Sequence, residues 1–512
     1  MIYRRTGFAA IFSLIAFFFI SPEIVLCQQY PSASEQGGDA LQMLEKGVER
    51  LTLSNGLRVV VYRRAGVPVF SGQIWVKVGG VNEVAGKTGI SHMLEHMAFK
   101  GSEVIGSKDF KKEKPLLDEL DRLMSGQDDT LEGEARQKRI AELEKELDEL
   151  SDGNEFSRLY ERRGAVGLNA GTAKDFTFYM VSLPTNEFEF WCWMESDRLL
   201  APVFRQFYKE REVVLEERRM RVDDDPGGKL YETLLDIAYK VHPNRLPVIG
   251  WADNVRNLQA HELKALYRTY YRPDNMVLSL VGDIELESAE PLLEKYFGRI
   301  PRAVGEIPQV SVVEPAQIAE RAAVVQFDAE PSLIMGYHKP VYPNADDMYF
   351  SILHGVLSDG RSSILQRELV EEKHLAAAIE TSEAPGELYP SLFIVAATPV
   401  AGVTTERLRD EIQLILDRLA SKPLPEKLIA EAKKRVRVGL LSGMRSNYGL
   451  SKMLGKTELF YGDWSEIVRM YKIVESTTPE NVREIAAKYL RPENRTYVRT
   501  VRPLKAKLEE KK

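Results

Sequence analysis

The sequence predicts an α+β protein of two tandem related domains, each a mainly antiparallel sheet packed with helices. The chain has 512 residues, which is too long for one ordinary core and suits two domains of roughly 200 residues. In addition, Tyr270-Tyr-Arg-Pro-Asp-Asn275 recurs 219 residues later as Tyr489-Leu-Arg-Pro-Glu-Asn494. A helical-looking stretch precedes each copy and a β-prone stretch follows it. We therefore expect a duplicated unit.

The composition is that of a folded, water-soluble protein. Hydrophobic residues make up 44% of the chain and charged residues 28%, which is close to the average for globular domains. The net charge is −7, whereas a dedicated nucleic-acid binder usually has a basic excess. We therefore expect no nucleic-acid partner.

The amino terminus has the pattern of a secretory signal peptide, residues 1–27. Arg4 and Arg5 precede the apolar run 8–20, which is shorter than the roughly 20 residues that cross a membrane. A retained membrane anchor and a lipid anchor at Cys27 are the alternatives, but neither is favoured. We predict an exported, periplasmic or secreted protein whose mature chain begins with a mobile segment, 28–45.

The first domain, 46–301, begins with a predicted β-hairpin. The run 51–62 contains two β-prone stretches joined by Asn55-Gly56, which is a strong hairpin signal. Strand-like and helix-like segments alternate through the rest of this domain. A proline-rich polar linker, 302–316, then leads to the second domain, 317–505.

A charged segment, 102–156, looks inserted into the first domain. Apolar residues at Ile140, Leu143, Leu147 and Leu150 are three or four apart and predict a helix with one apolar stripe. We interpret its charges as a solvated face; the alternative is a docking arm.

The chemistry is predicted from two histidines and a glutamate in one short motif. His92, Glu95 and His96 share a face if this segment is helical. The order His-x-x-Glu-His is the inverted zinc motif of metallopeptidases. Two imidazoles would bind zinc, and Glu95 would accept a proton from the attacking water. The alternative is a pair of histidines on a structural helix.

Catalytic zinc usually takes three protein ligands, so a third ligand is needed. The run 209–220 is the richest in glutamate among the candidates. Glu210 and Glu217 would share one helical face, and Glu212 and Glu216 would form another pair. The spacing does not choose between these two faces.

From about Leu51 to Pro503 the chain resembles the pitrilysin and insulin-degrading enzyme family, which also contains the mitochondrial processing peptidase. The first motif of the family appears as His92-Met-Leu-Glu-His96, continuing to Gly101. The second, Glu-Arg-x-Val-(Ile or Val)-x-x-Glu, appears as Glu210-Arg-Glu-Val-Val-Leu-Glu-Glu217. The resemblance implies that Glu217 is the third zinc ligand and that Glu210 is a supporting catalytic acid.

The resemblance also concerns substrate binding. The Asn-Ala of an edge strand in the family is matched by Asn169 and Ala170, which implies that the substrate backbone adds as a strand beside them. The alternative is that Asn169 only ends a buried strand. The His96–Glu217 separation of 121 residues exceeds the usual spacing, and the insertion accounts for the excess.

One departure from the family predicts a partner. Related chains carry an arginine and a tyrosine, seven residues apart, that help to hold substrate, but this sequence has Val370 and Ala377 there. Neither side chain can donate a hydrogen bond. We therefore expect a heterodimer with a second related two-domain subunit that supplies the arginine and tyrosine. The alternative is a homodimer whose donors come from other residues.

The predicted function is zinc-dependent endopeptidase activity on extended or unstructured peptides, with one zinc ion per chain and a metal-activated water. The second domain has no His-x-x-Glu-His and is expected to have a structural or substrate-enclosing role. The rival interpretation is a non-catalytic scaffold or assembly subunit of a related peptidase complex. A small-molecule amidohydrolase on the same metal is a weaker third interpretation.

Overall fold

The computed structural model describes residues 41–126, 131–302 and 304–503, and these residues form two β-sheets. The first sheet has the strand order β1-β2-β6-β3-β5-β4 and the second has the order β7-β11-β8-β10-β9. The strands are β1 (Val48–Thr52), β2 (Arg58–Arg63), β3 (Val69–Val76), β4 (Val166–Thr172), β5 (Thr177–Pro184), β6 (Met276–Gly282), β7 (Arg321–Gln326), β8 (Leu333–Lys339), β9 (Ala376–Ala384), β10 (Ser391–Pro399) and β11 (Arg495–Val501). One pair in each sheet is parallel and the others are antiparallel.

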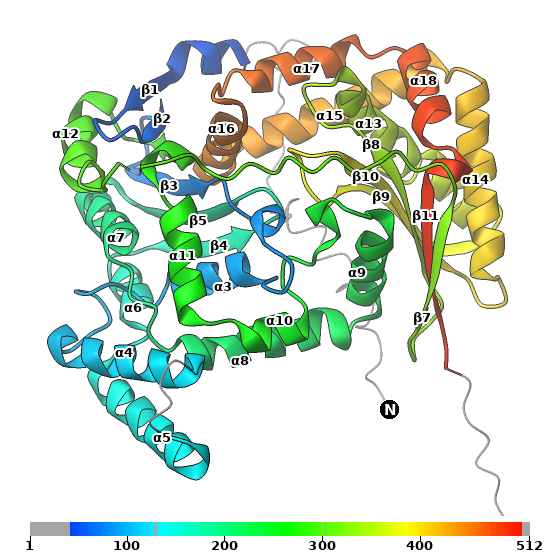
Figure 1. Cartoon of the computed structure of the whole chain (residues 1–512). Helices are drawn as coiled ribbons and strands as arrows, with labels where there is room; N and C mark the ends of the chain where they lie inside the picture. The colour runs from blue at the N-terminus through cyan, green and yellow to red at the C-terminus, as the bar shows by residue number, and fades with distance from the viewer. Residues whose placement is uncertain (1–40, 127–130, 303, 504–512) are drawn as a thin grey trace, which may run out of the picture.

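Helices pack on both sheets, which lie side by side in Figure 1. Those of the first half are α3 (Ile90–Met97), α4 (Phe110–Ser125), α5 (Gly133–Leu150), α6 (Glu155–Arg162), α7 (Phe188–Leu200), α8 (Phe207–Arg218), α9 (Pro226–Ala238), α10 (Ala252–Asn257), α11 (Ala260–Tyr270) and α12 (Leu286–Phe297). Those of the second half are α13 (Ala345–Leu357), α14 (Thr405–Ser421), α15 (Glu426–Arg445), α16 (Asn447–Tyr461), α17 (Glu466–Ser476) and α18 (Pro479–Tyr489). The predicted fold class is confirmed.

The two copies of the repeated hexapeptide occupy equivalent places in the two sheets. Each follows a helix, α11 or α18, and leads into a central strand, β6 or β11. The side-chain amide of Asn275 donates to the Tyr270 and Lys77 carbonyls, and that of Asn494 donates to the Tyr489 and His338 carbonyls. β6 and β11 are each parallel to one neighbour and antiparallel to the other. The repeat in the sequence therefore reflects a repeat in topology, whereas the exact domain boundaries stay a prediction.

Each half of the chain places one helix on the sheet of the other half. α9, from the first half, covers one face of the second sheet, where Leu230 and Leu234 pack against Ile394 and other strand residues. α16, from the second half, covers one face of the first sheet, where Leu450 and Leu454 join a core cluster that contains Trp75. Because each sheet buries apolar surface against a helix from the other half, the halves form one packed unit.

The amino-terminal part requires one correction. Residues 41–47 are helical rather than mobile, because Leu41 and Leu44 are buried in the cluster that contains Val60 and Trp75. The predicted hairpin is present, with β1 antiparallel to β2 around Asn55-Gly56. The predicted signal peptide and the remainder of the segment expected to be mobile lie outside the described residues.

The predicted helical insertion contains α4, α5 and the start of α6. α4 and α5 pack on each other and project at the lower left of Figure 1, with Leu143 and Leu147 of α5 buried.

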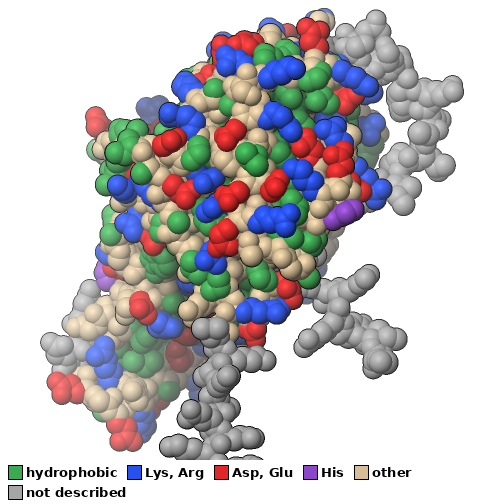
Figure 2. Space-filling model, turned by 90° about the vertical axis from the view of Figure 1, so that its right-hand side faces the viewer, with side chains coloured by type: hydrophobic (Ala, Val, Ile, Leu, Met, Phe, Trp, Pro, Cys, Tyr) green, Lys and Arg blue, Asp and Glu red, His purple; other side chains and the backbone are tan. Residues whose placement is uncertain are grey.

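Across the described parts of the chain, none of the helices combines the length and the apolar character that a membrane span needs. Figure 2 shows basic and acidic side chains intermingled over one face of the molecule. Ion pairs such as Arg418–Glu368 and Lys373–Glu411 involve α14 and the residues around it.

Candidate metal centre

α3 is fixed at its start by a glycine and a buried carboxylate. Gly89 has φ +87° and lies so close to Gly250 that a Cβ on Gly89 would be 2.9 Å from the Gly250 Cα. The Glu83 carboxylate accepts hydrogen bonds from the Gly89 and Ser91 backbone N–H groups, both at 2.8 Å. Burial raises the pKa of Glu83 to about 7, although these hydrogen bonds oppose the rise. Glu83 thereby satisfies N–H groups that the first turn of a helix leaves free.

Three side chains with metal-ligating atoms meet between α3 and α8. The rings of His92 and His96, one turn apart on α3, have centroids 4.7 Å apart. Glu217, in the last turn of α8, places Oε2 3.7 Å from His92 Nε2 and 3.3 Å from His96 Nε2. The three ligand atoms lie within 4.8 Å of one another, and no other group of three His, Cys, Asp or Glu in the described residues does so.

The donor set fits a zinc ion. Two atoms bound to one zinc at tetrahedral angles are about 3.4 Å apart when each lies 2.0–2.1 Å from the metal. The observed separations of 3.3 and 3.7 Å are close to this value. Two imidazoles and one carboxylate are also a ligand set that catalytic zinc takes while it keeps one position for water.

Glu210 orients His96 from the side away from the ligand cluster. Glu210 Oε1 lies 2.9 Å from His96 Nδ1, and Glu210 Oε2 lies 2.6 Å from Lys100 Nζ. Burial alone would raise the pKa of Glu210, but hydrogen bonds from His96 and Lys100 outweigh it and lower the pKa. Ionised Glu210 can only accept, so His96 must carry a proton on Nδ1, and its Nε2 faces Glu217.

The pKa values of the two histidines are shifted in opposite directions. Burial, reinforced by the charge of His96, lowers the pKa of His92 to about 4. Burial would lower the pKa of His96 as well, but its hydrogen bonds to Glu210 and Glu217 raise it to about 9. Burial opposes the ionisation of Glu217, yet contact with His96 and His92 lowers the pKa of Glu217 to about 2. Near pH 7 His92 is therefore neutral and Glu217 is ionised, which are the forms that bind a metal ion.

Glu95 lies on the same helix as the two histidines but is not part of the three-ligand cluster. Thr172 Oγ1, at the end of β4, lies 2.7 Å from Glu95 Oε2. Burial raises the pKa of Glu95, whereas the hydrogen bond from Thr172 lowers it. A buried carboxylate of raised pKa beside a cation site is suited to accept and return a proton.

The other glutamate pair on α8 points to solvent. The side chain of Glu212 is 68% exposed, and that of Glu216 is 54% exposed and paired with Arg219. Of the two helical faces that spacing alone left open, the structure turns the one with Glu210 and Glu217 toward α3.

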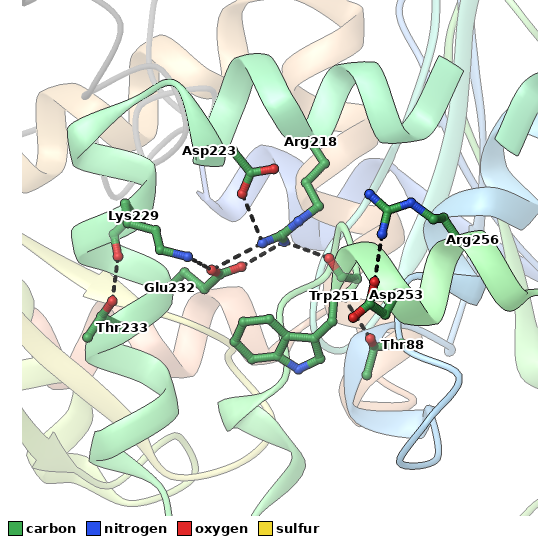
Figure 3. A network of polar contacts seen from close by, with 10 residues as sticks. Thr88, Arg218, Asp223, Lys229, Glu232, Thr233, Trp251, Asp253 and Arg256 are labelled. Atoms are coloured by element: carbon green, nitrogen blue, oxygen red, sulfur yellow. Dashed lines mark hydrogen bonds and ion pairs between the residues drawn. The ribbon is translucent and has the colours of Figure 1, made fainter. Parts of the chain in front are cut away.

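A buried polar network supports the end of α8 (Figure 3). Arg218 Nη1 donates to Glu232 Oε2 at 2.7 Å and to the Gly250 carbonyl at 2.6 Å. The Trp251 backbone N–H donates to Thr88 Oγ1 at 2.9 Å, next to the start of α3. Arg218, which directly follows Glu217, is therefore hydrogen-bonded to the loop at Gly250 and Trp251, and this loop contacts the start of α3.

The predicted substrate strand, β4, forms one edge of the first sheet, opposite β1. Asn169 is exposed and Ala170 is half-buried, and Asn169 Oδ1 accepts from the Ala170 N–H at 2.9 Å. The register is irregular between Val166 and Asn169.

In the second half, Val370 lies in the π-helix η6 (Gln366–Glu372) and packs against the core, whereas Ala377 is exposed on β9.

Three supporting residues of the centre were not predicted from the sequence. Lys100 follows His96 by four positions, Arg218 directly follows Glu217, and Thr172 ends the run that begins with Asn169 and Ala170. Each lies close in sequence to a predicted site residue. Only the folded arrangement gives each of them its partner.

Two family models and the similar proteins indicate one family of peptidases. Residues 58–114 match the family described as insulinase, peptidase family M16. Residues 257–436 match the domain described as the peptidase M16 inactive domain. The Helicobacter pylori protein called zinc protease PqqE is 29% identical over 411 residues, which cover 78% of this chain and 80% of that protein.

Solved structures show the same fold. A protease from Helicobacter pylori superimposes with a TM-score of 0.76 and 25% identity, covering 89% of this chain and 99% of that chain. The periplasmic protease PqqL from Escherichia coli superimposes with a TM-score of 0.65 and 17% identity, covering 90% of this chain but 48% of that chain. This chain therefore has the extent of about half of the longer protease.

Proposed function

The chain belongs to the insulinase family of peptidases, family M16, and we propose that it is a zinc-dependent endopeptidase. The observation that carries the proposal is the meeting of His92, His96 and Glu217 at ligand distances, with Glu95 outside that cluster on the same helix. This arrangement separates the three metal ligands from the general base, as peptide hydrolysis by activated water requires.

Zinc held by His92, His96 and Glu217 would supply Lewis acidity, which makes a water molecule more acidic and a peptide carbonyl more electrophilic. Glu95 accepts one proton of the water as its oxygen bonds to the carbonyl carbon. The carbon–nitrogen bond then breaks, and Glu95 returns the proton to the departing amine. Glu210 and Lys100 keep His96 in the tautomer whose Nε2 is free to bind metal.

We further propose that substrates bind extended along β4, beside Asn169 and Ala170. This edge has no neighbouring strand among the described residues, and backbone addition to a sheet edge selects unfolded segments rather than a particular sequence. Extended or unstructured peptides are therefore the proposed substrate class.

The experiment that tests the activity measures turnover of a quenched, unstructured peptide. Chelation should abolish turnover, and one equivalent of zinc per chain should restore it. Thermal unfolding before and after chelation serves as the control for loss of folding. Turnover that persists with less than a tenth of an equivalent of zinc would contradict the proposal.

One observation favours a second candidate, a non-catalytic subunit. Residues 257–436, which include much of the second half, match a domain described as inactive. The equivalents of the substrate-holding positions there are Val370 and Ala377, which carry no donor. Bound zinc without turnover, both for the chain alone and with every related subunit, would favour this candidate.

The same two positions support a proposal on assembly. An otherwise complete centre that lacks these donors would gain them from a second, related two-domain chain that carries the arginine and tyrosine. The chain superimposes on about half of the longer protease PqqL, which supports pairing with a second chain of the same fold. A related subunit should raise kcat/KM at least ~10-fold, as expected for restored carbonyl-holding donors. Full activity of the chain alone, unchanged by such a subunit, would exclude the heterodimer.

We also propose that the protein is exported. The support is the charged and apolar pattern of residues 1–27. Amino-terminal sequencing of the mature protein should find a start near Gln28. A mature chain that begins at Met1 would contradict export by a cleaved signal.

A further inference from the structure

Thr172 connects the edge strand to Glu95. It is the last residue of β4, and its Oγ1 lies 2.7 Å from Glu95 Oε2. Thr177, directly opposite on β5, has the same type of side chain on the same face. Thr177 Oγ1 donates to the Val78 carbonyl at 2.9 Å. The two threonines are therefore neighbours with different acceptors.

The number of available protons determines the direction of the bond to Glu95. A threonine hydroxyl has one proton, and an ionised carboxylate can only accept. The proton of Thr177 goes to the Val78 carbonyl, so Thr177 could only accept in the 3.4 Å contact between the two hydroxyls. The single proton of Thr172 has a nearer acceptor in Glu95 Oε2, at 2.7 Å. Thr172 can therefore donate to Glu95 Oε2. Glu95 Oε1 is left as the oxygen that can accept a proton.

We propose that Thr172 is a positioning residue for the general base, and that β4 thereby links substrate binding to the alignment of Glu95. This inference rests on the proposed function. The hydroxyl holds one carboxylate oxygen in both protonation states of Glu95, so the carboxylate does not have to turn during proton transfer. Because Asn169, Ala170 and Thr172 belong to the same strand, a peptide added to β4 lies in fixed register with the base.

The test is a double-mutant cycle that combines Thr172→Val with Glu95→Gln, measured with zinc content, kcat and KM for a quenched peptide. Thr172→Val alone should lower kcat about 10-fold, the order expected for a hydrogen bond to a charged group. KM and bound zinc should be unchanged. Thr172→Ser, which keeps the hydroxyl, should recover most of kcat. In the Glu95→Gln background, Thr172→Val should cause less than a twofold further loss.

Thr177→Val is the matched control, because it removes a hydroxyl from the same face that does not contact Glu95. Its kcat should stay within about twofold of the unmodified chain when measured below its unfolding temperature. An equal fall in Thr177→Val, a multiplicative loss in the double variant, or loss of zinc in Thr172→Val would each overturn the proposal. Full activity of Thr172→Val with an impaired Glu95→Gln would overturn it while leaving the proposed function intact. Equal activity of Glu95→Gln and the unmodified chain would reject both.

Discussion

At the scale of single residues, the centre depends on which oxygen of each carboxylate is already engaged. Glu217 turns Oε2 toward both histidines, while its Oε1 lies 2.9 Å from Arg221 Nη2. The neighbouring Glu216 is rotated about 100° around the helix and pairs with Arg219 at the surface. Two adjacent glutamates of the same chemistry are therefore expected to differ completely in metal binding.

We expect Glu217→Ala to lose zinc, because it removes one of three protein ligands. Glu216→Ala is the matched control and should keep one zinc per chain. Metal analysis after dialysis against a weak chelator measures both. Zinc loss in Glu216→Ala with zinc retained in Glu217→Ala would mean that the wrong face of α8 has been assigned.

The shared helix of His92, Glu95 and His96 could be predicted from sequence, because residues three and four apart lie on one helical face. Their chemical roles stay a prediction. Glu217 lies 121 residues from His96, so its choice over Glu216 needed a resemblance to known proteins. The contacts of Lys100 and Thr172 were not predicted, because each depends on a neighbour that only tertiary structure brings close.

At the scale of elements, the path from α8 to α9 determines where Glu217 lies. α8 continues directly into the π-helix η3 (Arg219–Asp223), and π-turns are frequent at functional sites. Arg218, at this junction, is buried with Glu232 of α9, and Glu232 also contacts Lys229. The network in Figure 3 thus fixes the end of α8, the helix that carries Glu217, through buried charged groups.

We expect Arg218→Met to lower the free energy of unfolding by about 3 kcal/mol, because it leaves the buried Glu232 carboxylate short of a partner. Zinc affinity should fall as well, since Glu217 is the adjacent residue. Arg219→Met removes an exposed arginine one position along and should leave stability essentially unchanged. Urea unfolding and zinc competition measure both variants. Equal stability of the two variants would contradict a structural role for the buried network.

Structural elements could be predicted where a few neighbouring residues determine them. The Asn55-Gly56 turn and the repeated Arg-Pro-x-Asn segments are specified by neighbouring residues, and both recur in the structure as expected. The exchange of α9 and α16 was not predicted. An apolar helical stripe indicates that a helix packs on something, but not which of two similar sheets it covers.

At the scale of the whole molecule, a buried carboxylate joins the two halves. Asp175, in the turn between β4 and β5, accepts the Leu388 N–H through Oδ2 at 3.2 Å and the Glu387 N–H through the same oxygen. Among the described residues, its Oδ1 has no hydrogen-bond partner. Burial raises the pKa of Asp175 to about 6, against the two hydrogen bonds, with Glu387 adding to the rise and Lys174 opposing it.

The raised pKa of Asp175 determines how the stability of the fold changes with pH. A carboxyl whose pKa is higher in the folded chain than in the unfolded chain stabilises the fold when protonated, and a proton on Oδ1 leaves both bonds to Oδ2 intact. Its contribution is therefore full below about pH 4 and is lost as pH rises through about 6. The difference is up to about 3 kcal/mol.

Asp175→Asn should remove this pH dependence, because the amide keeps an acceptor for the two N–H groups and does not titrate. Relative to the unmodified chain, the variant should gain stability between pH 4.5 and pH 7.5. Urea unfolding at both pH values measures the difference. A stability difference between the two proteins that is independent of pH would contradict the role assigned to Asp175.

Glu95→Gln distinguishes a general base at this position from a metal ligand. The purified variant should retain one zinc per chain by metal analysis, because His92, His96 and Glu217 are unchanged. Its hydrolysis of an unstructured peptide should fall at least ~10²-fold, as expected when a positioned base is removed. Full activity of Glu95→Gln would show that Glu95 is not the base, and loss of its zinc would show that Glu95 is a ligand.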